Sequence, residues 1–140
     1  MKTNAIRMFL ALGAACVCGS VLQAQTYQLA ANVPFEFQVG DKAVPQGKYV
    51  VSAYGPTGAQ AMLSAPNGER YFVSGAYPKL DSTGSARLVF HCYGDACFLA
   101  EIWPATGSGR IVSTSKAEKR IRQNGKIEMA MRTVDLIRAD

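Results

Sequence analysis

Residues 87–103 read RLVFHCY-GD-ACFLAEIW, two apolar runs on either side of the dipeptide Gly94-Asp95. A two-residue turn of the primed type needs positive φ, which glycine adopts at little cost, so this stretch predicts a β-hairpin. The register of that hairpin sets Cys92 opposite Cys97 at a non-hydrogen-bonded site. Because Cα atoms at such sites lie about 4.5 Å apart, within disulfide range, we predict a disulfide between these two cysteines.

A strand and a turn are predicted near the start of the mature chain. Apolar side chains recur at every second position from Val33 to Val39, which is typical of a half-buried strand. Pro34 has no amide N–H to donate, so we expect this strand at a sheet edge or with an irregular start. The turn Val44–Gly47 then leads into a second strand over Lys48–Tyr54.

A second hairpin is predicted around Ala65-Pro66-Asn67-Gly68. Proline at the second place, asparagine at the third and glycine at the fourth fit a type I turn whose glycine is left-handed. The resulting register places Leu63 opposite Tyr71 and Ala61 opposite Val73.

The C-terminal part combines a short helix with a last strand. Ser115-Lys116-Ala117-Glu118 has the pattern of a capping box, which predicts a helix over Lys116–Gln123. Asn124-Gly125 can end that helix through a left-handed residue. Apolar residues then recur at every second position from Ile127 to Met131, which predicts a strand that continues to about Ile137.

Together these elements predict the fold class. Short strands about ten residues apart, separated by Gly and Pro turns, are typical of all-β domains. We expect a mainly β fold, a single small antiparallel sandwich or barrel with one short helix near the C-terminus. No internal repeat or linker divides residues 25–140, so these residues are predicted to form a single β-rich domain.

The first 24 residues have the order of a secretory signal peptide. Lys2 and Arg7 precede an apolar run of about 15 residues, which is shorter than a membrane-spanning helix needs to be. We predict cleavage between Ala24 and Gln25, with cleavage after Ser20 as the alternative. The same segment is also compatible with a lipoprotein acylated at Cys16 or with an uncleaved anchor. The protein is therefore expected to be exported to the periplasm, the cell envelope or the extracellular space.

The charge of the mature chain is concentrated near its C-terminus. Residues 25–115 hold six Lys and Arg against six Asp and Glu, whereas residues 116–140 hold seven against four. This cluster predicts a site for an anionic envelope polymer or membrane surface, and the alternative is a solvated helix face. It lacks the density and the interleaved aromatic residues of a nucleic-acid surface, so no nucleic-acid partner is expected. The candidate anion-binding residues are Lys116, Lys119, Arg120 and Arg122.

No metal or cofactor is expected. The cluster of candidate ligands is His91, Cys92, Asp95 and Cys97, but a structural zinc site typically needs two Cys/His pairs and the mature sequence holds one. Adjacent strand residues also point to opposite faces of the sheet. The sequence contains no phosphate-binding glycine loop, dinucleotide fingerprint or haem-attachment motif.

Two enzymatic functions are kept as alternatives. His91 could serve a small secreted hydrolase as general base, with Asp95 or Asp81 and a serine, but no Gly-x-Ser-x-Gly motif is present. Cys92 and Cys97 could serve a thiol oxidoreductase, but they lack the Cys-x-x-Cys spacing that lowers a thiol pKa. In an oxidising exported compartment a structural disulfide is favoured. We therefore expect a non-enzymatic exported β-domain with a binding or structural role.

Five short blocks of the chain are similar in sequence to a known family of proteins. They are Asn32–Gly40, Val44–Val51, Leu88–Asp95, Phe98–Trp103 and Ser115–Glu118. These blocks resemble a family of small uncharacterised exported proteins typical of soil acidobacteria. The resemblance implies export and supplies no activity, cofactor or site residue. In these relatives other residues usually occupy the positions of Cys92 and Cys97, so the cysteine pair is particular to this chain.

Overall fold

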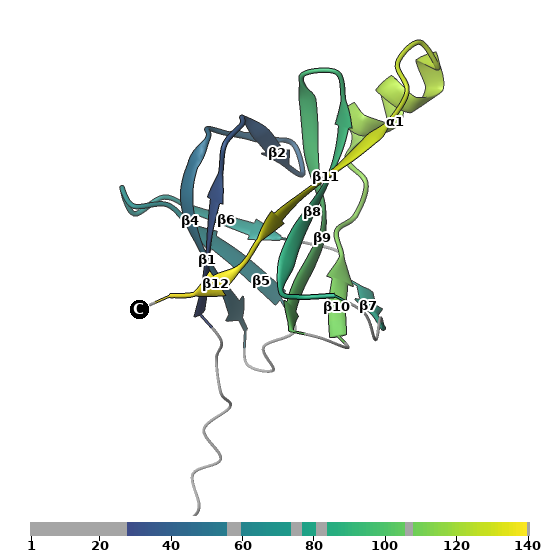
Figure 1. The fold of residues 1–140 in the computed structure, drawn as a ribbon. Helices are drawn as coiled ribbons and strands as arrows, with labels where there is room; N and C mark the ends of the chain where they lie inside the picture. The colour runs from purple at the N-terminus through teal and green to yellow at the C-terminus, as the bar shows by residue number, and fades with distance from the viewer. Residues whose placement is uncertain (1–27, 56–59, 74–76, 81–83, 106–107, 140) are drawn as a thin grey trace, which may run out of the picture.

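The computed structural model describes residues 28–55, 60–73, 77–80, 84–105 and 108–139, and the predicted signal peptide and its cleavage site lie outside them. Within these ranges the fold is mainly β, with two mostly antiparallel sheets and one short helix, α1 (Lys116–Asn124), as Figure 1 shows. The fold class predicted from the sequence is therefore confirmed. The first sheet contains, in spatial order, β12 (Ile137–Arg138), β1 (Gln28–Val33), β4 (Gly47–Tyr54), β5 (Gln60–Ser64) and β6 (Arg70–Val73).

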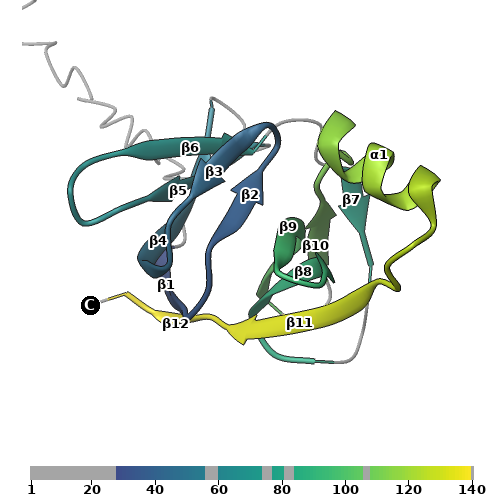
Figure 2. The same ribbon diagram turned by 90° about the horizontal axis from the view of Figure 1, so that it is seen from above.

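The second sheet is built around the hairpin predicted at residues 87–103. Its main path contains β11 (Ala130–Asp135), β8 (Arg87–Tyr93), β9 (Ala96–Ala105), β10 (Ser108–Ile111) and β7 (Tyr77–Lys79). A short strand, β2 (Phe37–Val39), joins β9 in parallel and pairs with β3 (Lys42–Val44). The described chain passes from one sheet to the other between β1 and β2, between β3 and β4, and between β11 and β12, where Figure 2 shows one C-terminal stretch running along both sheets.

The hydrophobic core lies between the two sheets. It contains Val51 and Leu63 from the first sheet and Leu88, Phe90 and Ile102 from the second, all fully buried. Burial of apolar surface on this scale supplies the main stabilising free energy of such a domain.

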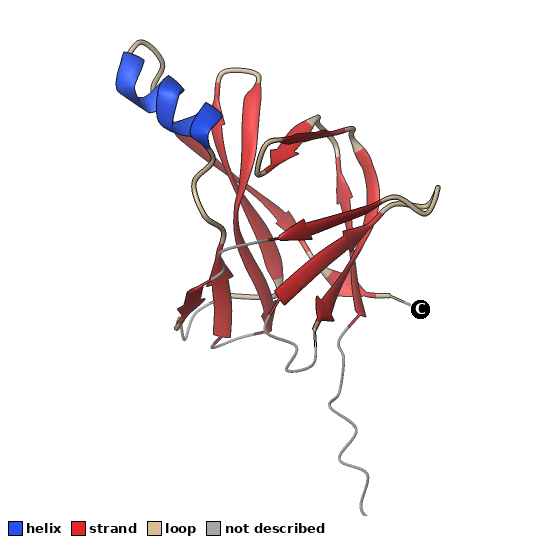
Figure 3. Cartoon of the chain, turned by 180° about the vertical axis from the view of Figure 1, so that it is seen from behind, coloured by secondary structure: helices blue, strands red, loops and turns tan. Residues whose placement is uncertain are grey.

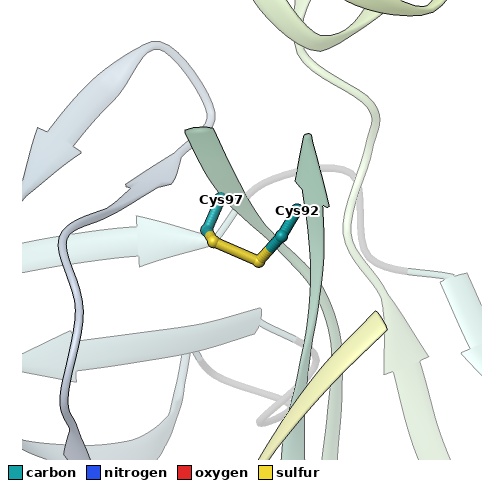
Figure 4. The surroundings of a disulfide bond; sticks show 2 residues. All are labelled: Cys92 and Cys97. Atoms are coloured by element: carbon teal, nitrogen blue, oxygen red, sulfur yellow. A yellow bond between two sulfur atoms is a disulfide. The ribbon is translucent and has the colours of Figure 1, made fainter. Parts of the chain in front are cut away.

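The central hairpin has the predicted register. Cys92 pairs with Cys97, with Cα atoms 4.0 Å apart, and the two form a disulfide (Figure 4). Gly94 has φ 61°, as the turn requires. Both cysteines are 3% exposed and belong to the core, so the disulfide is part of the packed interior.

The strand predicted from Val33 to Val39 is divided into two. β1 ends at Val33 and β2 begins at Phe37, because Pro34 cannot donate to the ladder and the chain changes sheet there. Of the two predicted alternatives, the irregular start is the one observed, because the pairing resumes only at Phe37, whereas β1 lies inside the first sheet between β12 and β4. Phe35, between the two strands, packs edge-on against Phe90 with ring centroids 5.0 Å apart.

The second hairpin and the helix agree with their predictions. Leu63 pairs with Tyr71 and Ala61 with Val73, and Gly68 of the connecting turn has φ 91°. The helix α1 extends one residue further than predicted, to Asn124. Gly125 caps its C-terminus with φ 61°, in the left-handed region.

The last strand differs from the prediction in where it begins and in which side chains it exposes. β11 begins only at Ala130, so two of the apolar residues that suggested a strand precede it. Ile127, Met129 and Met131 are 50%, 40% and 61% exposed. Their alternation therefore does not mark a core face, and these apolar side chains lie at the surface.

Candidate functional site

A buried carboxylate, that of Glu118, holds α1 against the central hairpin. Its Oε1 accepts hydrogen bonds of 2.9 Å from Tyr93 Oη and 3.1 Å from Arg122 Nη2. His91 Nδ1 lies 3.1 Å from the same oxygen. Glu118 is 3% exposed and is the one charged side chain that is buried among the described residues. We refer to His91, Tyr93, Glu118 and Arg122 as the polar cluster.

The local sequence of the helix places Glu118 in this position. The amide of Glu118 donates a 3.1 Å hydrogen bond to Ser115 Oγ, which fixes where the helix begins. Ala117 and Ile121, which are both partly buried, then lie one turn apart on the side of the helix that carries Glu118. On β8, Tyr93 and His91 alternate with the core residue Cys92, so they project from the opposite face of the sheet.

The charges in the polar cluster compensate one another. The hydrogen bond to Tyr93 and the negative charge of Glu118 raise the pKa of Arg122, against a smaller opposing effect of burial. Burial and the hydrogen bond to Glu118 raise the pKa of Tyr93, although Arg122 opposes this. The guanidinium therefore stays charged and the phenol stays protonated, so both can donate to the carboxylate.

His91 can bond to either charged member of the cluster. Its Nδ1 lies 3.1 Å from Arg122 Nη2 as well as from Glu118 Oε1. A protonated Nδ1 donates to the carboxylate, whereas an unprotonated one accepts from the guanidinium. The carboxylate beside His91 is thus Glu118, whereas the sequence suggested Asp95 or Asp81. Asp95 is exposed at the hairpin turn, and Asp81 lies outside the described residues.

The outward side of α1 carries basic residues and no acidic one. Lys116, Lys119 and Arg120 recur at the spacing that places side chains on one helix face, and Lys126 follows just beyond the helix. All four are exposed, and their side chains form no hydrogen bond or ion pair with the part of the chain that the structure describes. We call these four residues the cationic face. Arg122, which the sequence grouped with them, is also exposed, but its guanidinium is paired with Glu118 in the polar cluster.

The helix and its return segment project from the body of the domain. Figure 1 shows α1 and the turn after it extending beyond the sheets, and Figure 3 shows the same projection from behind. Exposed apolar side chains lie next to the basic ones here, because Ile127 directly follows Lys126 and Met129 is two residues further. We call Ile127 and Met129 the apolar tip.

A groove of about 650 Å³ opens at one end of the sheets, between the β1–β2 connection and the turn of the central hairpin. Arg132 of β11 lies in it, with its guanidinium carbon 4.0 Å from the centre of the Phe35 ring. The groove is lined by acidic, basic and amide side chains together. Its lining therefore does not favour one chemical class of ligand. Its polar members besides Arg132 are Glu36, Gln38, Gln46 and Asp95.

A second polar group fixes the single tryptophan of the chain. Trp103 Nε1 donates a 2.7 Å hydrogen bond to Glu101 Oε2, and Lys79 Nζ donates one of 2.9 Å to Glu101 Oε1. Burial raises the pKa of Glu101, but these two hydrogen bonds and the positive charge of Lys79 outweigh it and lower the pKa overall. Both carboxylate oxygens of Glu101 accept a hydrogen bond from within the protein, so this group stabilises the fold around Trp103.

Comparison with known proteins gives no family and no template: no protein-family model, curated protein or solved structure matches the chain. Within the described ranges, no helix is long and apolar enough to cross a bilayer. Those ranges also contain no group of three or more His, Cys, Asp or Glu side chains that could hold a metal ion. The function has to be inferred from the chemistry of the site itself.

Proposed function

We propose that the protein is an exported, non-enzymatic β-domain that binds an anionic surface in or outside the cell envelope through the cationic face of α1. One observation carries the proposal. The single acidic residue of the helix, Glu118, points inward and is bonded to Arg122, so Lys116, Lys119 and Arg120 face solvent without a compensating charge.

The charge distribution of the whole chain supports this assignment. Residues 25–115 are neutral in sum, so the positive field of the mature chain originates in its last 25 residues. The projection of α1 from the sheets brings that field to an extremity of the molecule (Figure 1). Exposed charges act over about 8 Å at physiological salt, so contact rather than distant steering must supply the attraction.

The enzymatic alternatives receive less support from the same residues. A hydrolase built on His91 needs a nucleophilic oxygen, and the hydroxyl group of the polar cluster is the phenol of Tyr93, whose pKa is raised. A thiol oxidoreductase needs an accessible thiolate, whereas Cys92 and Cys97 form a disulfide and are almost fully buried. His91→Ala tests the first alternative, since the loss of a hydrolytic activity in a folded variant would favour it.

Export is supported by the first 24 residues and by the resemblance to small exported proteins. Lys2, Arg7 and the apolar run that follows have the order of a secretory signal. The intact mass of the exported protein tests this part of the proposal. A mature chain that begins at Gln25 is expected, and a retained N-terminus or an acylated Cys16 would contradict it.

The binding function is tested by retention on an immobilised acidic polysaccharide at low salt. Lys116→Glu, Lys119→Glu and Arg120→Glu combined should abolish retention, because they reverse the cationic face while glutamate keeps a high helix propensity. The matched control reverses three exposed basic residues of the sheets, Lys42, Lys48 and Arg70, with the same change in net charge. If the wild type is not retained, or both triple variants lose retention equally, the proposal fails.

A further inference from the structure

We propose that the anionic surface is a phospholipid bilayer, and that the apolar tip enters its headgroup region while the cationic face contacts the lipid phosphates. This inference rests on the proposed function and names its partner. The protein would lie on the membrane surface as a peripheral domain, held by a basic and an apolar contribution together.

Several exposed apolar side chains lie close together in the chain after α1. Eight large hydrophobic side chains are exposed among the described residues, and three of them, Ile127, Met129 and Met131, lie within five consecutive residues. Ile127 and Met129 precede β11 and therefore belong to no strand of the sheet. Contiguous exposed apolar surface is typical of interaction sites, whereas single scattered apolar residues are not, so this grouping points to a partner surface.

Basic residues lie beside these apolar side chains. Lys126 directly precedes Ile127, and Lys119 and Arg120 lie on the outward face of the helix that leads to it. Glu128 is the one acidic residue between Ile127 and Met129, and it is exposed. Basic residues beside apolar ones are the combination that an anionic bilayer accommodates, with phosphates for the charges and acyl chains for the side chains.

A hydrated anionic polymer can bind the cationic face, but it offers nothing to the apolar tip. An acidic polysaccharide offers charge to Lys116, Lys119 and Arg120 but no apolar phase to Ile127 and Met129. A bilayer removes both apolar side chains from water, which is a favourable transfer. Methionine is flexible and adapts well to an irregular environment. The bilayer is therefore the partner that uses the cationic face and the apolar tip at once.

The segment that carries the apolar tip is attached to the fold at both ends. The polar cluster joins α1 to β8 through the carboxylate of Glu118, and Gly125 reverses the chain at the end of the helix. β11 then pairs with β8 from Ala130 onward. Because the segment is anchored at both ends, binding does not have to order a free chain.

The experiment measures co-sedimentation of the whole protein with vesicles of phosphatidylcholine mixed with phosphatidylglycerol, and its binding to soluble dextran sulfate. All variants are compared with the same N-terminus, checked by intact mass. Ile127→Ser and Met129→Ser combined should lower vesicle binding about tenfold and leave dextran sulfate binding unchanged. The matched control, Phe72→Ser and Leu80→Ser combined, removes two exposed apolar side chains elsewhere and should change neither.

Each outcome separates this inference from the proposed function. Reversal of Lys116, Lys119 and Arg120 should abolish binding to both partners if the inference holds. If the wild type binds dextran sulfate but not vesicles, or if the serine variant binds vesicles as well as the wild type, the bilayer is the wrong partner and the proposed function stands. If the wild type binds neither, the proposed function fails and this inference fails with it.

A spectroscopic readout tests insertion directly. The variant Ile127→Trp adds an indole at the apolar tip, whereas Trp103 is 1% exposed in the body of the domain. Its fluorescence emission should shift to shorter wavelength on anionic vesicles and remain unchanged with dextran sulfate. An unchanged emission in vesicle-bound protein would show that the tip stays in water and would overturn the inference.

Discussion

Tyr93 of β8 donates a 2.9 Å hydrogen bond to Glu118 of α1, and both side chains are 3% exposed. This contact is one of those that hold the helix against the sheet. It turns the single acidic residue of α1 toward the sheet and leaves the basic residues on the outside. The attachment of the helix to the sheet and its surface charge therefore both depend on Glu118.

Glu118→Ala should destabilise the protein by about 1–3 kcal/mol, because it leaves the buried Tyr93 hydroxyl without its acceptor and removes the carboxylate that pairs with Arg122. The measurement is the free energy of unfolding in urea. The control is Glu128→Ala, an exposed position at which about 0.5 kcal/mol or less is expected. Equal effects at the two positions would mean that the polar cluster does not hold the helix.

Replacing Cys92 and Cys97 with alanine should lower the free energy of unfolding by about 2 kcal/mol, since the disulfide closes a loop of only a few residues. A reducing agent in the urea titration should lower the stability of the wild type and leave the variant unchanged. Two free thiols in native protein by peptide mapping would contradict the pairing.

Gly109→Ala should disturb the packing around the tryptophan. A Cβ atom at this position would lie 2.4 Å from atoms of the Trp103 ring, so the indole has to move. Overpacking of this kind costs about 1–3 kcal/mol. Because Trp103 is the single tryptophan, its emission wavelength reports the displacement, and an unchanged emission together with an unchanged Tm would contradict the tight contact.

Stability should fall at high pH through Tyr71. Its hydroxyl donates a 2.7 Å hydrogen bond to Glu69 Oε2, and this bond, followed by burial, raises the pKa of Tyr71 from 10.0 to about 12. Since the folded protein holds the proton more tightly, the stabilisation is complete below pH 10 and is lost as the pH rises from 10 to about 12.

Tyr71→Phe should therefore be less stable than the wild type at neutral pH and should show a smaller decline between pH 10 and pH 12. Some decline remains, because burial and the charge of Glu69 also raise the pKa of Tyr49. The measurement is the urea midpoint at a series of pH values. Parallel curves for the two proteins would show that Tyr71 is not the titrating group.

The sequence predicted the elements whose signals are local. Gly94 and Gly68 define the two turns, and each turn fixes the register of its hairpin because the partners lie a few residues apart. Ser115 and Gly125 define the helix in the same way. The division at Pro34 was only half predicted, since the missing N–H is visible in the sequence but the change of sheet depends on tertiary packing.

The polar cluster could not be predicted in the same way. Glu118 meets His91 and Tyr93, which lie 27 and 25 residues earlier in the chain, and no local pattern encodes this contact. One signal was available, because Ala117 and Ile121 mark an apolar helix side on which Glu118 also lies. A carboxylate on that side is expected to be bonded inward, and its i+4 partner Arg122 would then be distinguished from the basic residues of the helix that have no acidic partner.

The most direct test of the proposed surface compares Lys119→Gln with Arg122→Gln. Both remove one positive charge from the same helix, but Lys119 belongs to the cationic face and Arg122 to the polar cluster. The quantity measured is the affinity for dextran sulfate across a series of salt concentrations. Losing a charge that contacts the polyanion should reduce the slope of log affinity against log salt by about one. We predict this reduction for Lys119→Gln and an unchanged slope for Arg122→Gln, and equal slopes for the two variants would contradict the cationic face as the binding surface.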